Sequence, residues 1–196
     1  LHVSRPTARQ ALQRLVDRGL LTRRRGVGTI VSPRHVHRPM ELTSLMRDLV
    51  NAGHKVHTTI QHYEARPATA QEADTLKITE GTLVVHIERT RFADNEPIAV
   101  LTNLIPADIA PTMQELESAS LYDLMRERGV TLASARQVIG ARSATTKEAK
   151  LLSEHRGAAL LTSQRTTYDP SGRIVECGNH IYRASRYSFE ASLFAQ

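Results

Sequence analysis

An internal repeat limits the possible folds of this chain more than any other sequence feature. Shifting the sequence by 76 residues aligns 44–106 with 120–182 without a gap and gives 17 identities. Two copies of one supersecondary unit explain such self-similarity. We therefore expect two halves related by an approximate twofold axis, with a cleft where they meet. The identities are Ser44/Ser120, Leu45/Leu121, Gly53/Gly129, Gln61/Gln137, Ala65/Ala141, Arg66/Arg142, Ala68/Ala144, Thr69/Thr145, Glu72/Glu148, Ala73/Ala149, Leu76/Leu152, Gly81/Gly157, Arg89/Arg165, Thr90/Thr166, Ile98/Ile174, Asn103/Asn179 and Ile105/Ile181.

Each copy reads as a helix, a strand, a short second helix and a β-hairpin. Apolar residues at helical spacing in 42–50 stop at Gly53, and 121–129 repeats the pattern. Thr69 with Glu72, and its repeat, have the spacing of a capping box that opens the short helix. These elements predict an α+β domain with a largely antiparallel sheet and helices packed on it. The expected strands are 56–63, 83–92, 98–104, 132–139, 160–168, 174–182 and 186–193.

The excess positive charge is confined to the start of the chain. Residues 1–40 contain nine Arg and one acid, a balance of +8, whereas the whole chain has a net charge of +6, so the remainder carries −2. This asymmetry is typical of a nucleic-acid-binding arm attached to a neutral domain. A basic signal or membrane anchor would share the charge, but it needs an adjoining apolar stretch or a lipidation motif, and neither is visible.

A basic helix and a basic hairpin are expected within this arm. Ser4 and Pro6 form a helix start, apolar residues at helical spacing follow, and Gly19 ends the helix. Residues 20–31 predict a β-hairpin with an arginine- and glycine-containing tip. The alternative to a nucleic-acid-binding helix is a solvated surface helix with an exposed arginine face. The combination favours a groove-reading helix followed by a wing that contacts phosphates.

SRPTARQALQRLVDRGLLTRRRGVGTIVS, residues 4–32, resembles the second half of the winged helix-turn-helix of GntR-superfamily regulators. In that family the first turn of this helix and the turn before it read base edges, and the wing tip enters the minor groove. The family's earlier helices would lie before Leu1, so we expect a truncated winged helix-turn-helix. The resemblance assigns base reading to Ser4, Arg5, Thr7 and Arg9, and wing contacts to Arg24, Arg25 and Gly26.

Residues 33–40 read as a linker because they contain two prolines and show no periodicity. His35 and His37 could suggest a metal ligand pair, but no carboxylate or cysteine lies close in sequence, so we expect no metal and no cofactor. The single cysteine, Cys177, excludes an intramolecular disulfide. No apolar run approaches the roughly 20 residues of a membrane helix. A cytoplasmic location is therefore expected.

The strand expected at 83–92 carries two arginines on one face. Because strand side chains alternate, Leu83, Val85, Ile87, Arg89 and Arg91 share the side that faces the core. Buried guanidiniums are costly unless an anion pairs with them. Internal ion pairs, for example to Glu176, are one explanation. An anion-binding pocket is the other, since an arginine fork matches phosphate or carboxylate.

Three segments resemble the effector-binding UTRA domain of the HutC subfamily of GntR regulators: IERTRFADNEPIAVLTNLIP, SLYDLMRERGV and VECGNHIYRASRYSF. The resemblance spans about residues 40–194 and implies a chorismate-lyase-like fold. Members that sense sugar phosphates have an acidic residue where this chain has Leu101, so we favour an anionic ligand with a more apolar body over an amino-sugar phosphate. The implied effector-binding residues are Thr58, Thr59, Arg89, Arg91, Ser120, Tyr122, Glu176 and Tyr182.

Two other functions are compatible with parts of this pattern. A chorismate-lyase-like enzyme acting on a small anion shares the fold, but the sequence has no nucleophile–base spacing, no metal-ligand cluster and no glycine-rich phosphate loop. A structural DNA-binding protein would need neither the arginine pair nor the cleft. The sequence therefore predicts a ligand-responsive transcription regulator. We expect a homodimeric repressor that binds operator DNA and is released from it by a small phosphorylated or carboxylated metabolite. Its expected parts are 1–32 for DNA binding, 33–40 as linker and 41–196 as effector domain.

The confined charge predicts strongly salt-dependent DNA binding. In a protein with the whole winged helix-turn-helix, the slope of log K against log salt should fall by about one for each phosphate-contacting arginine removed. Arg5→Ala should instead relax base preference at a cost of roughly 1–3 kcal/mol. Titration of operator and scrambled DNA at several salt concentrations measures both effects, and a salt-insensitive operator complex would contradict the electrostatic argument.

Overall fold

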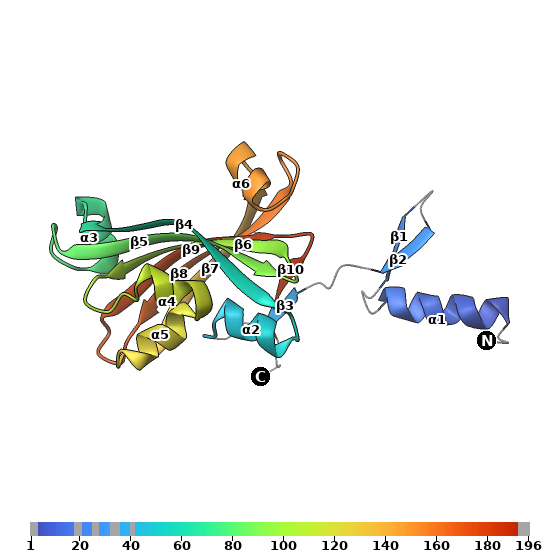
Figure 1. Ribbon diagram of the computed structural model, residues 1–196, viewed down its shortest axis with the longest axis horizontal. Helices are drawn as coiled ribbons and strands as arrows, with labels where there is room; N and C mark the ends of the chain where they lie inside the picture. Colours follow the sequence, from blue (N-terminus) through green and yellow to red (C-terminus); the bar gives the residue numbers. More distant parts are fainter. Residues whose placement is uncertain (1–3, 18–20, 25–27, 32–35, 40–41, 192–196) are drawn as a thin grey trace, which may run out of the picture.

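The computed structural model describes residues 4–17, 21–24, 28–31, 36–39 and 42–191. Its first unit is helix α1 (Arg5–Asp17) and an antiparallel hairpin of β1 (Leu21–Arg24) and β2 (Gly28–Val31), as the sequence predicts. The Thr7 N–H donates to Ser4 Oγ at 3.3 Å, which identifies Ser4 as the cap of α1. Figure 1 shows this unit apart from the remainder of the chain.

The second unit is built on one antiparallel sheet of six strands, with the order β4-β5-β6-β9-β8-β7. This order is the first copy of the repeat followed by the second copy reversed, so β6 and β9 meet at the centre and β4 and β7 lie at the two edges. The twofold relation expected from the repeat is confirmed. The strands are β4 (Val56–Pro67), β5 (Leu83–Ala93), β6 (Glu96–Pro106), β7 (Ser134–Ser143), β8 (Ala159–Tyr168) and β9 (Ile174–Arg183).

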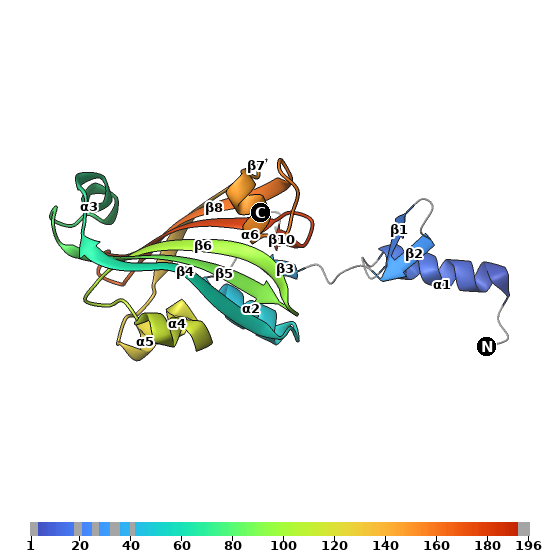
Figure 2. The ribbon, with the colours of Figure 1, turned by 45° about the horizontal axis from the view of Figure 1, so that its top comes forward.

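Helices cover both faces of this sheet (Figures 1 and 2). One face packs against α2 (Leu45–Asn51), α4 (Met113–Ser118) and α5 (Leu121–Glu127), which bury apolar side chains over β5, β6 and β9. The other face packs against α3 (Ala70–Leu76) at one end and its repeat counterpart α6 (Thr146–Leu151) at the other. Among the described helices none is long and apolar enough to span a bilayer.

A small parallel pair joins the start of this unit to its end. Strand β3 (Val36–Pro39) pairs with β10 (Tyr187–Glu190), so that Val36 lies opposite Tyr187. Residues 36–39 fall within the segment read as a linker, and they are a strand because their backbone partners come from the far end of the chain. Val36 is buried against the sheet with Leu45, Leu49 and Tyr187.

The sheet register corrects the gapless alignment of the two copies. Arg89 pairs with Leu101, whereas its counterpart Arg165 pairs with Gly178. The second hairpin is therefore one residue longer, and the offset between β6 and β9 is 77 instead of 76. Because neighbours in a strand point to opposite faces, the counterpart of Asn103 is His180. The identities Asn103/Asn179, Ile98/Ile174 and Ile105/Ile181 do not mark equivalent positions.

A second correction concerns the apolar face of β5. Val85, Ile87, Arg89 and Arg91 are buried as expected, but Leu83 is 58% exposed. It is the first residue of the strand and lies beyond the helices that cover this face.

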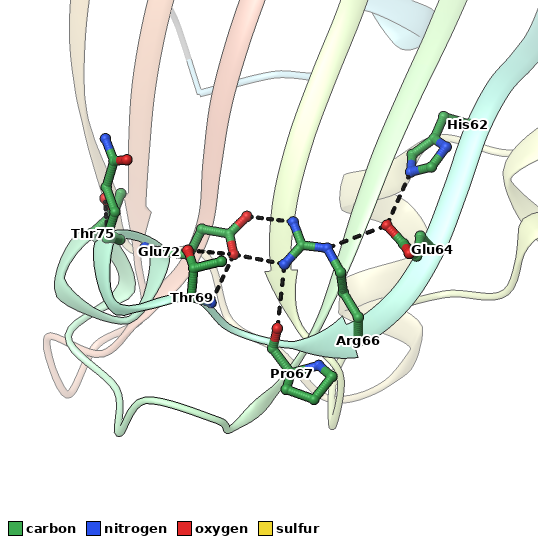
Figure 3. A network of polar contacts seen from close by, with 8 residues as sticks. His62, Glu64, Arg66, Pro67, Thr69, Glu72 and Thr75 are labelled. Atoms are coloured by element: carbon green, nitrogen blue, oxygen red, sulfur yellow. Dashed lines mark hydrogen bonds and ion pairs between the residues drawn. The ribbon is translucent and has the colours of Figure 1, made fainter.

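Both predicted capping boxes are present, and each is reinforced by an arginine. Glu72 accepts the backbone N–H of Thr69, and Arg66 donates to both of its carboxylate oxygens at 2.6 and 2.7 Å (Figure 3). Arg142 makes the same bidentate contact with Glu148 at the other end of the sheet. These contacts lower the pKa of Glu72 and of Glu148 to about 2, the hydrogen bonds from the arginine being the main cause.

The two carboxylates predict a specific acid dependence of stability. Their folded pKa values lie below the unfolded value of about 4.3, so their contribution is present above that pH and is lost as the pH falls toward 2. The double variant Glu72→Gln/Glu148→Gln should be less stable at pH 7 and should lose less stability between pH 4.5 and 2. Urea unfolding across this range measures it. The exposed pair Glu80→Gln/Glu117→Gln is the control, and an unchanged acid profile in the first variant would contradict the assignment.

Candidate ligand pocket on the twofold axis

A pocket of about 390 Å³, counting its open mouth, lies between the sheet and the first turns of α2 and α5. It sits on the twofold axis, because several of its lining residues are counterparts from the two copies. Arg89 and Arg165 are one such pair, and Asn103 and His180 are another. The lining residues are Thr43, Ser44, Leu45, Met46, Arg89, Arg91, Leu101, Asn103, Leu121, Tyr122, Arg165, His180 and Tyr182.

Arg89 and Arg91 bring two buried positive charges to the pocket. Each is 2% exposed, and neither forms an ion pair with a carboxylate of the described residues. Arg89 Nε and Nη1 and Arg91 Nε are buried and have no hydrogen-bond partner within the described chain. Burial lowers the pKa of Arg89 to about 10, and burial together with the charge of Arg89 lowers the pKa of Arg91 to about 9. Both side chains are therefore cations at neutral pH.

The side-chain amide of Asn103 connects Arg89 to a buried carboxylate. Arg89 Nη2 donates to Asn103 Oδ1 at 2.8 Å, and Asn103 Nδ2 donates to Glu176 Oε1 at 2.6 Å. Asn103 Nδ2 also lies 3.3 Å from His180 Nε2 across the twofold axis. The sequence suggests a direct ion pair between Glu176 and the arginines. The structure instead connects Arg89 to Glu176 through the Asn103 side chain. The amide is fixed with its oxygen toward the guanidinium.

Glu176 lies behind the pocket instead of on its surface. It is fully buried, and its second oxygen accepts hydrogen bonds from Thr167 Oγ1 at 2.8 Å and Tyr122 Oη at 3.2 Å. Arg165, which donates to Tyr122 Oη and to Gln137 Oε1, supplies the nearby positive charge. Burial raises the pKa of Glu176, and burial together with Glu176 raises the pKa of Tyr122 to about 12.

Gly178 makes this arrangement possible. A Cβ at this position would lie 2.5 Å from Glu176 Oε1 and 2.6 Å from His180 Nε2. Glu176 and His180 lie on the same face of β9 as position 178. Their side chains extend over Gly178, and both contact the Asn103 amide. Any larger residue would push them apart.

The ring of Tyr182 closes the pocket on the side of β3 and β10. It is fully buried, its Oη lies 3.3 Å from His180 Nδ1, and it stacks on Tyr187 with ring centroids 4.2 Å apart. Tyr187 in turn lies opposite Val36 in the parallel pair. Through Tyr187, one wall of the pocket is thus connected to β3, which lies within the segment 33–40 expected to be a linker.

The remaining residues singled out from the sequence have different positions. Thr58 Oγ1 accepts a hydrogen bond from Arg91 Nη1, whereas Thr59, the next residue on β4, is exposed on the other side of the strand. Ser120 is buried and caps α5 by accepting the Asp123 N–H at 3.4 Å. Ser120, Thr58, Thr59 and Glu176 are not among the residues that line the pocket.

Of the positions assigned to DNA contact, Ser4, Thr7 and Arg9 are exposed at the start of α1. The side chains of Arg5 and Arg24, and residues 25 and 26, lie outside the described part of the chain.

Sequence reasoning did not assign Asn103, Arg165 or His180 to the pocket. The identity of Arg89 and Arg165 in the repeat was a usable signal, because residues near a twofold axis meet their counterparts. The pairing of Asn103 with His180 could not be found in this way, since the extra residue in the second hairpin hides it. In the described residues no group of three or more His, Cys, Asp or Glu side chains is placed to hold a metal ion.

Comparison with known proteins agrees with this architecture. Residues 51–188 match the UTRA domain model, and residues 1–31 match the model of bacterial regulatory proteins of the gntR family. The chain is 33% identical to the HTH-type transcriptional repressor NagR of Bacillus subtilis, over 95% of this chain and 78% of NagR.

Two solved structures are similar. The crystal structure of PhnF from Mycobacterium smegmatis superposes with a TM-score of 0.86 at 26% identity, covering 99% of this chain and 87% of PhnF. A transcriptional regulator from Streptomyces coelicolor is 48% identical with a TM-score of 0.65, covering 73% of this chain and 96% of that protein.

Gly178→Ala should disrupt the pocket because the new methyl group displaces Glu176 and His180. We expect a loss of about 1–3 kcal/mol in the free energy of unfolding, the usual cost of overpacking a core. Gly140→Ala on β7 is the matched control, since its Cβ meets only Thr162 Oγ1, at 3.0 Å. Urea unfolding of both variants provides the measurement, and equal stabilities would show that the crowding around Gly178 is readily relieved.

Proposed function

Because this chain belongs to the GntR family of bacterial regulatory proteins and carries a UTRA domain, we propose that it is a transcription regulator controlled by a small anion bound at Arg89 and Arg91. The relatives it matches are named as transcriptional regulators and repressors, which places it among regulators and not enzymes. The proposed parts are a DNA-binding unit in residues 1–32, a linker around 33–40 and an effector domain in 41–196.

The observation that carries this proposal is the pair of buried cations without a carboxylate partner. Three guanidinium nitrogens of Arg89 and Arg91 are buried and unpartnered. Leaving buried donors unsatisfied costs about 1–3 kcal/mol each, and more when they are charged. An anion in the pocket would accept hydrogen bonds from these donors and offset both charges. Binding would therefore be favoured, because it would remove a desolvation cost that the ligand-free fold bears.

Apolar side chains define the rest of the proposed ligand site. Leu101, 5% exposed, lies beside Arg89 on the neighbouring strand, and Leu45, Met46 and Leu121 contribute from the two helices. A phosphorylated or carboxylated metabolite with a partly apolar body suits this lining. Tyr122 and Tyr182 also line the pocket, and Glu176 would act indirectly by fixing Asn103 and Tyr122.

A path to the DNA-binding unit follows from the same contacts. Tyr182 stacks on Tyr187, β10 pairs with β3, and β3 lies within the segment 33–40 that leads from the DNA-binding unit. Thr43, which lines the pocket, is four residues after the end of β3 in sequence. A ligand that shifts Tyr182 or Thr43 would therefore bias the strand to which the DNA-binding unit is attached, which is the two-site coupling that regulation requires.

We propose that the regulator acts as a repressor in the bacterial cytoplasm, where operator DNA is found. Each chain contributes one recognition helix, so a homodimer on a pseudo-palindromic operator is the matching assembly. Exposed Thr7 and Arg9, with Ser4 and Arg5, are proposed to read bases, and Arg24, Arg25 and Gly26 to contact the minor groove.

Arg91→Thr tests the ligand site with the least disturbance of the fold, because Thr167 occupies the equivalent position in the second copy. A hydrogen bond to a charged group contributes roughly 1.5–3 kcal/mol, so affinity for inorganic phosphate should fall by at least about tenfold. Calorimetric titration measures this, and the melting temperature without phosphate should change little.

Arg156→Thr removes the same charge from an exposed loop and should bind phosphate like the unaltered protein. Absence of phosphate binding by the unaltered protein, or equal affinity in the Arg91 variant, would refute the proposed site. A collapse of the melting temperature with unchanged affinity would assign Arg91 to the scaffold.

A further inference from the structure

The sheet has a second hollow, on the face opposite the pocket of Arg89 and Arg91. In Figure 1 helices α3 and α6 lie above the sheet, whereas α2, α4 and α5 lie below it. Within the described chain, α3 and α6 pack only on the two ends of their face. Beside α6 this face forms a hollow of about 750 Å³, counting its open mouth, which we call the back hollow. Its volume is within the range of small-molecule sites, roughly 300–1,000 Å³.

The charged side chains that line the back hollow are paired with one another. Lys147 Nζ on α6 lies 3.2 Å from Glu88 Oε1 on β5. Arg142 on β7 donates to both carboxylate oxygens of Glu148 at 2.5 and 2.7 Å. The ring of His180 lies on the opposite face of β9, so it brings no charge to this side. The two cations and the two carboxylates therefore balance, and a charged ligand would find no unpaired opposite charge among them.

A row of uncharged polar side chains crosses the floor between these two ion pairs. Thr102 on β6 lies opposite Asn179 on β9, and Asn179 lies opposite Gln164 on β8. Neighbouring strands are about 4.8 Å apart, and opposed residues point to the same face, so the three side chains stand side by side. Each can donate and accept hydrogen bonds, and none of the three forms a side-chain hydrogen bond within the described chain.

An aliphatic strip runs beside the polar row. Val100 on β6 lies opposite Ile181 on β9, two residues along each strand from the polar pair of the same strands. Leu151 of α6 packs against the same apolar cluster and also lines the back hollow. The back hollow thus offers hydrogen-bonding groups along one row and aliphatic groups along the next.

We propose that the back hollow binds an uncharged, hydroxyl-rich molecule of the saccharide or polyol class. Hydroxyl groups both donate and accept, as the threonine hydroxyl and the two amides do, so one ligand can satisfy several members of the row. The C–H groups of the same molecule suit the aliphatic strip. A purely apolar ligand would leave the polar row without partners, which opposes its binding. This site goes beyond the proposed function and does not rest on it.

NMR titration of the whole 196-residue chain with D-glucose, maltose and myo-inositol tests the proposal, in the absence of DNA and phosphate. At least one of these probes should shift the side-chain NH₂ signals of Asn179 and Gln164 saturably. The double variant Asn179→Leu/Gln164→Met retains the approximate side-chain sizes and should bind that probe at least tenfold more weakly, because several hydrogen bonds are lost together. The backbone amide signal of Thr102 reports the affinity in this variant.

Gln71→Met is the matched control, since it removes an exposed amide on α3 outside the back hollow, and it should bind the probe like the unaltered chain. Thr102→Val removes a single hydroxyl group without changing the side-chain shape and should weaken binding severalfold, which keeps the test available if the double variant does not fold. Absence of a saturable shift with all three probes, or shifts confined to residues outside the back hollow, would overturn the proposal. Affinities that are unchanged in the folded variants would overturn it as well.

Discussion

The buried charge of Arg89 and Arg91 is the constraint around which this fold is arranged. Two guanidiniums at 2% exposure bear a large desolvation cost, and the described chain offsets it only indirectly. The Asn103 side chain accepts a hydrogen bond from Arg89 and donates one to Glu176. Thr58 Oγ1 accepts a hydrogen bond from Arg91. Three guanidinium nitrogens remain without a partner in the described chain, and both arginines line the pocket. The anion proposed as effector would complete the electrostatics of this site.

The twofold relation explains how one scaffold makes such an asymmetric site. Arg89 and Arg165 occupy equivalent positions, but Arg91 in the first copy corresponds to Thr167 in the second. The second hairpin's extra residue places Glu176 opposite Thr167, and Gly178 gives the carboxylate room to reach Asn103. The first copy therefore presents uncompensated cations, and the second supplies the carboxylate that orients their neighbours.

Much of this architecture follows from the sequence, because its signals are local or repeated. The 76-residue repeat predicts two halves related by an approximate twofold axis, and Thr69 with Glu72 predicts a cap that the structure contains. The pairing of β3 with β10 joins distant segments and has no local pattern. The contact of Asn103 with His180 depends on one extra residue, which a gapless alignment with apparent identities conceals. The position of Glu176 behind the pocket depends on Gly178, which carries no sequence signal of its own.

The most direct test of the central claim is the unfolding free energy of Arg91→Met, measured in urea with and without phosphate. Methionine keeps the length and apolar stem of the side chain and removes a buried charge that lacks a carboxylate partner. If the charge is maintained for ligand binding, the variant should be more stable than the unaltered protein without phosphate and should gain nothing when phosphate is added. A less stable variant, or one that phosphate stabilises as much as the unaltered protein, would contradict the account.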